Sequence, residues 1–141
     1  MTITCTRRIQ FCAGHRVHGH EGKCRHLHGH NYVAWFTAEA DELDNLGRVI
    51  DFTALKGRLG SWVDENWDHG FIVWERDEEA KAALALMPSQ KKFELPTNPT
   101  AENMADHLLR IVGPDRLKGT GVRLVRVVID ETENCSAEVI L

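Results

Sequence analysis

Residues 15–30 hold six of the chain's eight histidines, and this segment constrains the fold more than any other. Residues 14–27 are rich in glycine and histidine and show neither the two-residue period of a strand nor the 3.6-residue period of a helix, which predicts a loop. Segments with strand character precede and follow that loop. We therefore expect two strands that run into and out of the loop and bring histidines at its two ends together.

The flanking segments have the pattern of half-buried strands. Residues 2–12 alternate between apolar and polar side chains, with Ile3, Cys5, Ile9 and Phe11 on one face. A second strand is predicted at about 28–40, which is rich in aromatic and β-branched residues. Near the other end of the chain, strands are predicted at about 121–131 and 135–141, joined by the polar turn 132–134.

Helices are predicted between these two pairs of strands. Asp51 has the features of an N-cap, and apolar residues recur at helical spacing through 52–66. Residues 76–87 predict a weaker helix, and the two prolines in 91–100 predict an extended connection. Thr100 is predicted to cap a third helix that ends at Gly113-Pro114.

The order of elements predicts a single α+β domain over residues 1–141, with a four-stranded antiparallel sheet and helices on one face. The strand within 122–129 carries apolar side chains on both faces. One face can pack against the helices, and the other then needs a second cover. We therefore expect the chain to assemble with other copies of itself.

Composition narrows the possible functions. With 17 basic and 21 acidic residues the formal charge is −4, so we expect no nucleic-acid partner. The apolar runs are too short for a transmembrane helix, and the N-terminal segment has no apolar export signal, which favours a cytoplasmic protein without membrane association. The four cysteines are then expected to be reduced, with Cys5, Cys12 and Cys135 buried in strands.

Three histidines are candidates for a metal site. His28 and His30 are two residues apart and project to the same face of a strand, and His15 lies in phase with Ile9 and Phe11. Three imidazoles leave one tetrahedral position open, as in catalytic zinc sites, although nickel and iron remain alternatives. Histidines at this spacing also occur by chance. The remaining histidines of the cluster, His18, His20 and His26, are interpreted as solvated loop residues or as donors around the site.

Four further residues have side chains suited to proton transfer or substrate binding. Cys24 lies between Lys23 and Arg25, and this charge favours a reactive thiolate, although an inert loop cysteine fits equally well. Asp68 can orient the adjacent His69, or the two can simply end a helix. Glu131 at a strand end can accept paired hydrogen bonds from an amidine-like ring edge such as that of a pterin, or be a solvated turn acid. His107 is expected at the surface.

Six short motifs occur in an order that resembles the 6-pyruvoyltetrahydropterin synthase / 6-carboxytetrahydropterin synthase family. They are FCAGH (11–15), Cys24 with His28-Gly29-His30, IDF (50–52), Asp68-His69, NPTAEN (98–103) and Glu131-Thr132. The spacing of three residues between Cys24 and His28 is similar to the bacterial 6-carboxytetrahydropterin synthase branch. The sequence departs from the short bacterial members between Asp68-His69 and Asn98, where it is longer and acidic in its first half.

The resemblance implies a Zn²⁺ ion bound by His15, His28 and His30, with Cys24 as the catalytic base. It implies that Asp68 and His69 form a second proton-transfer element and that Glu131 anchors the pterin ring, with Thr100 and Thr132 near it. It also implies the tunnelling fold, in which trimers form a 12-stranded barrel and two trimers stack as a homohexamer with sites between subunits.

The implied activity is that of a zinc-dependent lyase acting on 7,8-dihydroneopterin triphosphate. The products would be 6-carboxy-5,6,7,8-tetrahydropterin, acetaldehyde and triphosphate, on the route to queuosine and other 7-deazapurines. An alternative within the family is 6-pyruvoyltetrahydropterin synthase, which eliminates triphosphate without cleaving the side chain. An alternative from another class is a non-catalytic protein that stores metal in the histidine-rich loop.

Overall fold

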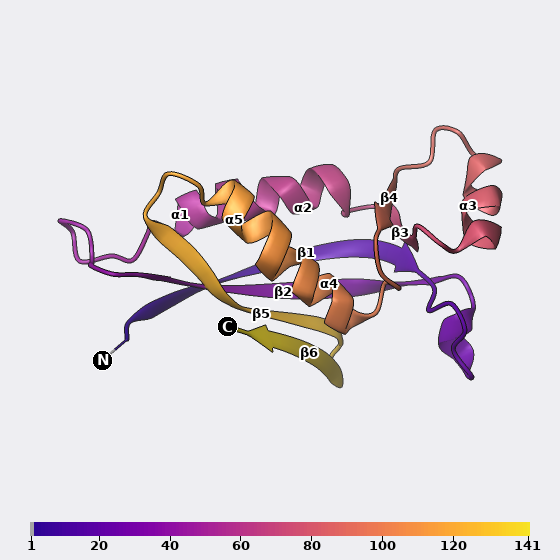
Figure 1. Cartoon of the computed structure of the whole chain (residues 1–141), viewed down its shortest axis with the longest axis horizontal. Coiled ribbons are helices and arrows are strands. Elements are labelled where there is room, and N and C mark those ends of the chain that lie inside the picture. The colour runs from indigo at the N-terminus through magenta and orange to yellow at the C-terminus, as the bar shows by residue number, and fades with distance from the viewer. Residues whose placement is uncertain (1) are drawn as a thin grey trace.

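In the computed structural model, which describes residues 2–141, the two strands that flank the histidine-rich loop are the longest in the molecule. Strand β1 (Thr4–His15) pairs antiparallel with β2 (His28–Ala40) along its whole length, and the two lie at the centre of the sheet (Figure 1). β1 runs three residues beyond the predicted end at residue 12 and so carries His15 itself. The loop predicted at 14–27 is therefore shorter, and it contains one helical turn, η1 (Lys23–Arg25).

The sheet has six strands in the order β4-β3-β1-β2-β5-β6, so the prediction of four strands is wrong in number. The expected pair β5 (Val122–Thr132) and β6 (Cys135–Ile140) is antiparallel and extends the sheet from β2. On the other side, β3 (Gly70–Trp74) and β4 (Lys92–Leu95) add two short parallel strands. Both lie where no strand was predicted, because five apolar residues and an extended connection carry too little alternation to indicate one.

The predicted helix over 52–66 is present as one continuous helical stretch. It consists of α1 (Phe52–Leu55), a wider π-helical turn η2 (Lys56–Gly60) and α2 (Ser61–Asn66). Asp51 caps it as expected, since its side chain accepts a hydrogen bond from the Thr53 N–H. Of its apolar stripe, Leu55, Leu59 and Val63 are fully buried in the main core, whereas Phe52 is exposed.

The third predicted helix begins at its predicted cap but continues past its predicted end. It comprises α4 (Ala101–His107), a π-helical turn η3 (Leu108–Val112) and α5 (Gly113–Arg116). Pro114 does not end it: this residue stands in the first turn of α5, directly after η3, and the helical stretch continues through it. Gly113 is explained by packing, since a Cβ there would lie 2.9 Å from Leu124 Cδ2 on β5.

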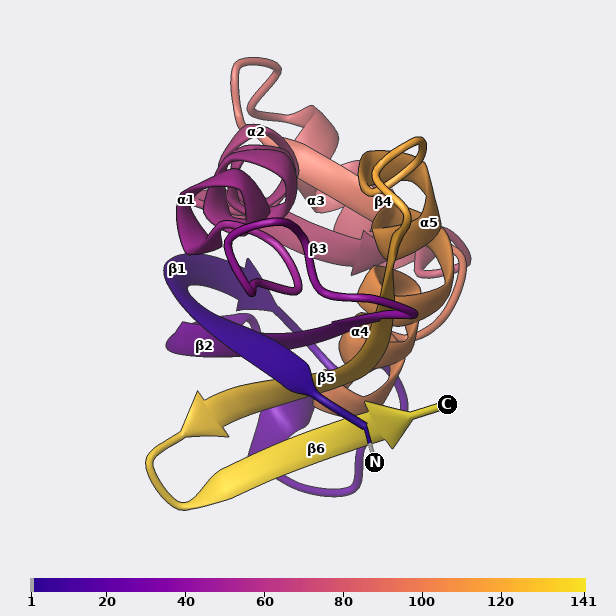
Figure 2. The same cartoon turned by 90° about the vertical axis from the view of Figure 1, so that its left-hand side faces the viewer.

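The helices α1–α2 and α4–α5 cover one face of the sheet, as Figures 1 and 2 show. The main core lies between these layers and includes the fully buried Phe11, Tyr32 and Trp67. Helix α3 (Glu78–Ala85), which confirms the weaker predicted helix, is an exception to the expected one-sided arrangement. In β3, Ile72 belongs to the main core, whereas Val73 packs with Ala80 and Leu84 of α3 in a second cluster. Because successive strand residues face opposite ways, α3 covers the other face of β3.

The cysteines are all free, but they are less buried than expected. Cys5, Cys12 and Cys24 are half-buried, and Cys135 is exposed because β6 is an edge strand with one neighbour. Among the described helices, none combines the length and the apolar character that crossing a bilayer requires.

Candidate metal and catalytic site

His15, His28 and His30 meet at the end of the β1–β2 hairpin, as the sequence predicts. His15 lies directly opposite His28 in the antiparallel register, and His30 is opposite Ala13. The ring centroids of the three histidines are 4.7, 4.8 and 5.2 Å apart. Each offers a nitrogen within 4.8 Å of the others, so together they could hold a metal ion.

Backbone carbonyls fix the orientation of two of these rings. His15 Nδ1 donates to the Pro99 carbonyl at 2.6 Å, and His28 Nδ1 donates to the His26 carbonyl at 2.7 Å. With the proton on Nδ1, each Nε2 keeps a free lone pair, which is the form that binds a metal. His15 is fully buried and its Nε2 has no hydrogen-bond partner. A buried lone pair of this kind is costly unless a ligand satisfies it, and the donor set therefore fits zinc.

Burial keeps the imidazoles of His15 and His30 neutral. Burial lowers the pKa of His15 to about 4, the Pro99 hydrogen bond only partly opposes this, and His28 and His30 lower it further by repulsion. Burial also lowers the pKa of His30, against the attraction of Glu131. Neutral imidazole is the form that binds a metal, so these two rings need no deprotonation at neutral pH.

Glu131 lies at the edge of the triad. It stands near the end of β5, and its Oε1 is 3.4 Å from His30 Nε2. Tyr32, which the sequence reasoning missed, follows His30 on the same face of β2 and is fully buried, with a hydroxyl that has no hydrogen-bond partner. Burial raises the pKa of Tyr32, with smaller contributions from Glu131 and Cys24. Its position two residues after His30 was the available signal.

Cys24 is the middle residue of η1, in the loop between the two strands that carry the triad. Its thiol is half-buried, and its carbonyl accepts a hydrogen bond from the Val17 N–H at 2.7 Å. This hydrogen bond connects Cys24 to Val17, which lies at the start of the same loop. The position of Cys24 therefore depends on how the start of the loop is held.

Asp68 and His69 form a hydrogen-bonded pair in the turn between α2 and β3. The distance from His69 Nδ1 to Asp68 Oδ2 is 2.9 Å, and Asp68 Oδ1 accepts from the Cys12 N–H at 3.0 Å. Burial alone would raise the pKa of Asp68, but the hydrogen bonds from Cys12 and His69 and the charge of Lys91 together lower it. Asp68 is therefore a carboxylate that can orient the imidazole of His69.

The backbone of this turn is strained and is held by Lys91. His69 has φ of 58°, the left-handed conformation that non-glycine residues rarely adopt. Lys91 Nζ donates to the carbonyls of Asp68 at 2.6 Å and Asp64 at 2.5 Å. The sequence reasoning missed Lys91, and nothing local to it would have indicated this role.

The Asp68–His69 pair contacts the backbone of Cys12. Cys12 pairs with Asn31 in the register, one position away from the pair Ala13 and His30, so the side chains of Cys12 and Asn31 project to the opposite face of the sheet from that of His30. The side chain of His69 is 80% exposed and lines a depression of about 540 Å³ on the face of Cys12. The depression is lined by Cys12, Ala13, Gly14, Leu27, Gly29, His30, Asn31, His69, Gly70, Phe71, Leu84, Met87 and Gln90.

The other candidate residues have local structural contacts. Thr100 caps α4 through the Asn103 N–H, next to the Pro99 carbonyl that binds His15. Thr132 accepts from the Asn134 N–H in the β5–β6 turn. The prediction that His107 lies at the surface is wrong, because its half-buried ring packs against Trp62, Trp67 and Phe93. All three aromatic residues lie outside the helix of His107, so the local pattern could not indicate the cluster.

Comparisons with known proteins agree on one family. Residues 4–140 match the family described as 6-pyruvoyl tetrahydropterin synthase. The 6-carboxy-5,6,7,8-tetrahydropterin synthase of Rickettsia bellii is 43% identical over 137 residues, which cover 97% of this chain and 99% of that protein. The enzyme of the same name from Haemophilus influenzae is 29% identical over 125 residues, covering 84% and 89%.

Solved structures show the same fold. An uncharacterized protein from Wolinella succinogenes superposes with a TM-score of 0.79 at 25% identity, covering 99% of this chain and 98% of that one. The 6-pyruvoyl tetrahydropterin synthase of Caenorhabditis elegans superposes with a TM-score of 0.71 at 24% identity, covering 99% and 96%.

Proposed function

This chain belongs to the 6-pyruvoyl tetrahydropterin synthase family of enzymes, and we propose that it acts as a 6-carboxy-5,6,7,8-tetrahydropterin synthase. The substrates would be 7,8-dihydroneopterin triphosphate and water, and the products 6-carboxy-5,6,7,8-tetrahydropterin, acetaldehyde and triphosphate, in cytoplasmic synthesis of queuosine and other 7-deazapurines. The observation that carries the proposal is the cluster of His15, His28 and His30, with Cys24 on the loop that joins their strands.

In this proposal the three histidines hold Zn²⁺. Three features support it: the free lone pairs at Nε2 of His15 and His28, the lowered pKa values, and the imidazole-only donor set. When bound, zinc would act as a Lewis acid that polarises the oxygens of the pterin side chain.

The chain's own residues would bind the ring and move protons. Glu131 would accept two hydrogen bonds from the amidine-like edge of the pterin and so fix the side chain beside the triad. Thr100 and Thr132 would lie near that ring. Cys24 would take a proton from the substrate as a thiolate, and His69, oriented by Asp68, would return one.

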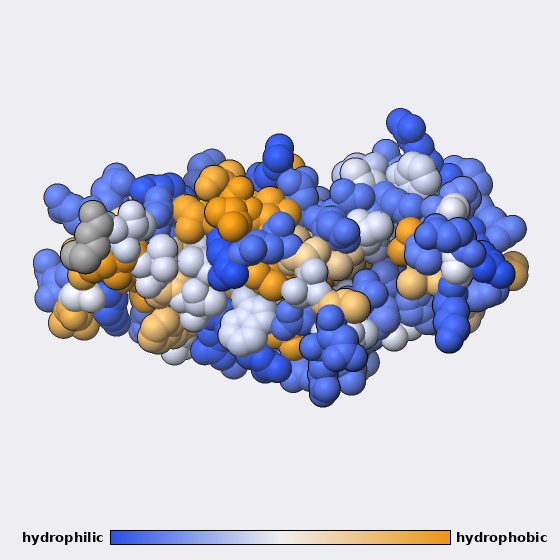
Figure 3. Space-filling view, turned by 90° about the horizontal axis from the view of Figure 1, so that it is seen from below, coloured by the Kyte–Doolittle hydropathy of each residue, from blue (hydrophilic) through white to orange (hydrophobic). Residues whose placement is uncertain are grey.

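We also propose that the enzyme is a homohexamer built of two trimers, with sites shared between chains. The exposure of the His69 side chain, beside the backbone of Cys12, supports this, because a neighbouring copy could supply the second proton-transfer group. Apolar side chains also gather over part of the underside of the molecule, to the left of its middle in Figure 3. Exposed apolar residues at the chain ends include Ile3, Ile140 and Leu141.

The test is to incubate the purified protein with 7,8-dihydroneopterin triphosphate and to measure products and bound metal on the same sample. Acetaldehyde with a carboxypterin supports the proposal. A pyruvoyl product without acetaldehyde would instead identify a 6-pyruvoyltetrahydropterin synthase. No turnover, with more than one metal ion per chain, would favour the metal-storage alternative.

A further inference from the structure

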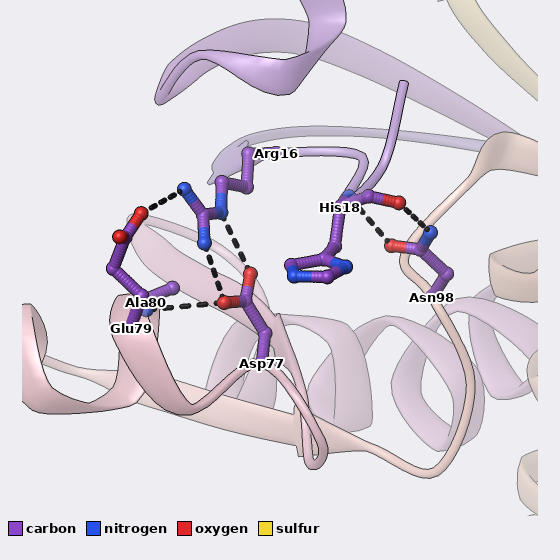
Figure 4. Close-up of polar contacts among 6 residues, drawn as sticks. All are labelled: Arg16, His18, Asp77, Glu79, Ala80 and Asn98. Carbon is purple, nitrogen blue, oxygen red and sulfur yellow. Dashed lines mark hydrogen bonds and ion pairs between the residues drawn. The ribbon is translucent and has the colours of Figure 1, made fainter. Parts of the chain in front are cut away.

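Arg16, the first residue after His15, forms a nearly buried ion pair with Asp77, which lies 61 positions later in the chain (Figure 4). Its Nε donates to Asp77 Oδ2 at 2.7 Å, and one terminal nitrogen donates to Asp77 Oδ1 at 2.5 Å. The side chains of Arg16 and Asp77 are 15% and 2% exposed. This two-bond geometry fixes the direction of the arginine as well as its distance. A third bond runs from Arg16 to the exposed Glu79.

Asp77 is itself held in place by α3. Its Oδ1 also accepts a hydrogen bond from the Ala80 N–H at 3.1 Å, as the N-cap of that helix. Helix α3 is anchored without Arg16, through the apolar cluster of Val73, Ala80 and Leu84. Asp77 is therefore a fixed point, and Arg16 is the group that it holds.

The hydrogen bonds lead from Arg16 to Cys24. Val17, the next residue, donates its N–H to the Cys24 carbonyl at 2.7 Å. On its other side, His18 is held by Asn98, which accepts from the His18 N–H at 3.1 Å and donates to the His18 carbonyl at 2.9 Å (Figure 4). The residue that binds the backbone of Cys24 thus lies between two anchored neighbours.

We propose that the Arg16–Asp77 ion pair positions Cys24, and that the long segment between His69 and Asn98 supplies the anchor for the catalytic loop. The role of Cys24 in this statement rests on the proposed function, whereas the restraint on the loop does not. Asp77 and Arg16 are positioning residues, because they act on Cys24 through Val17. Without the carboxylate charge, the guanidinium of Arg16 has no charged partner and is better stabilised by solvation in water. Arg16 and the start of the loop therefore move outward.

Limited trypsin digestion tests the restraint, since Lys23 and Arg25 flank Cys24 and offer cleavage sites inside the loop. The variant Asp77→Asn removes the charge and keeps an N-cap residue. We expect its cleavage after Lys23 and Arg25, followed by mass spectrometry, to be at least about tenfold faster than in the wild type, since hydrogen bonds to charged groups are lost. Arg16→Gln should give the same result, and the double variant should be no faster than either single one.

Two control variants separate this effect from general destabilisation. Glu94→Gln removes an ion pair between β4 and Lys81 of α3, and Val112→Ala opens a small cavity in η3. Both variants should lower thermal stability, but neither should accelerate cleavage within the loop by more than that general loss of stability explains. If Asp77→Asn also leaves the cleavage rate unchanged, the ion pair does not hold the loop and the inference is wrong.

Turnover and metal content then test whether the restraint matters for Cys24. Asp77→Asn should lower kcat by about tenfold or more, with little change in KM, because a displaced group is still present but misaligned. Bound metal should stay at the wild-type level, since His15 is held separately by Pro99. Faster cleavage with wild-type kcat would overturn the positioning role. If the wild type itself has no turnover, the proposed function fails while the cleavage result still decides the restraint.

Discussion

The histidine triad and the Asp68–His69 pair are built in opposite ways. The triad stands on two paired strands, with His15 fully buried, and its geometry follows from the register of the hairpin. The pair stands in a turn, with a strained backbone at His69 and a side chain that is 80% exposed. The first arrangement brings its three rings together within one chain, whereas the second places an oriented imidazole at the surface.

We propose that this difference reflects two separate roles in the proposed reaction. A metal site needs fixed distances, and a ladder of strand hydrogen bonds provides them. A group that meets the substrate from another side needs exposure in the isolated chain, and a turn provides that. The strain at His69 is maintained by Lys91 and by the Cys12 backbone, which suggests that the orientation of the imidazole matters.

The largest expected effect separates chemistry from metal binding. Cys24→Ala should lower turnover by about 10³-fold, the scale of a lost general base. Metal content should stay at one ion per chain, because no triad ligand has changed. His28→Ala is the matched control, in which metal and turnover should be lost together. Full turnover in Cys24→Ala would rule out Cys24 as the base.

Mixing variants tests whether the two regions act across chains. Cys24→Ala and His69→Ala proteins should each be nearly inactive. After joint unfolding and reassembly in equal amounts, turnover should recover to about one quarter of the wild-type value, since half of the sites receive each intact group independently. Recovery is measured against each variant reassembled alone. If the mixture stays inactive, Cys24 and His69 serve a site within one chain.

Lys91→Met should weaken the turn without touching the triad. We expect kcat to fall by about 10- to 100-fold, the cost of a misplaced catalytic group, with unchanged metal content. The lost positive charge should raise the pKa of Asp68, so the acidic limb of the pH–rate profile should move to higher pH. Lys91→Arg, which keeps the charge, should keep the limb near its wild-type position. If the acidic limb of the pH–rate profile does not move in Lys91→Met, the charge of Lys91 does not lower the pKa of Asp68 and this prediction is wrong.

The smallest expected effect is on the pH dependence of folding stability, through His107, which lies outside the triad and the Asp68–His69 pair. Burial lowers the pKa of His107 in the folded protein below its unfolded value of about 6.5. The unfolded chain therefore binds more protons below that pH, and folding stability falls as the pH decreases through this window. The free energy of unfolding of His107→Phe should fall less than that of the wild type over this pH range. The difference is at most about 1.4 kcal/mol per pH unit for one proton, and it is smaller because the ring is half exposed. Urea unfolding at pH 7 and pH 5 measures the difference, and parallel changes in both proteins would exclude the effect.

Periodic features of the sequence predicted most of the fold. The phase of His15 with Ile9 and Phe11, and the spacing of His28 and His30, were enough to predict the triad because strand pairing turns alternation into a shared face. The helix N-caps at Asp51 and Thr100 were equally predictable from the sequence, since each depends on residues within one helical turn.

The rest depended on contacts between distant segments. Strands β3 and β4 are too short to show a period, and their pairing with β1 comes from the whole sheet. The partners of Arg16, His18 and Lys91 lie at least 23 positions away in sequence, so no local pattern contained them. His107 was misassigned because its helix face meets aromatic residues from other elements.

The most direct test of the central claim is product analysis after incubation of the zinc-loaded protein with 7,8-dihydroneopterin triphosphate. We expect acetaldehyde and 6-carboxy-5,6,7,8-tetrahydropterin in equal amounts, and neither product from the Cys24→Ala protein with the same zinc content. A metal-loaded wild-type protein that yields no acetaldehyde would contradict the proposed reaction.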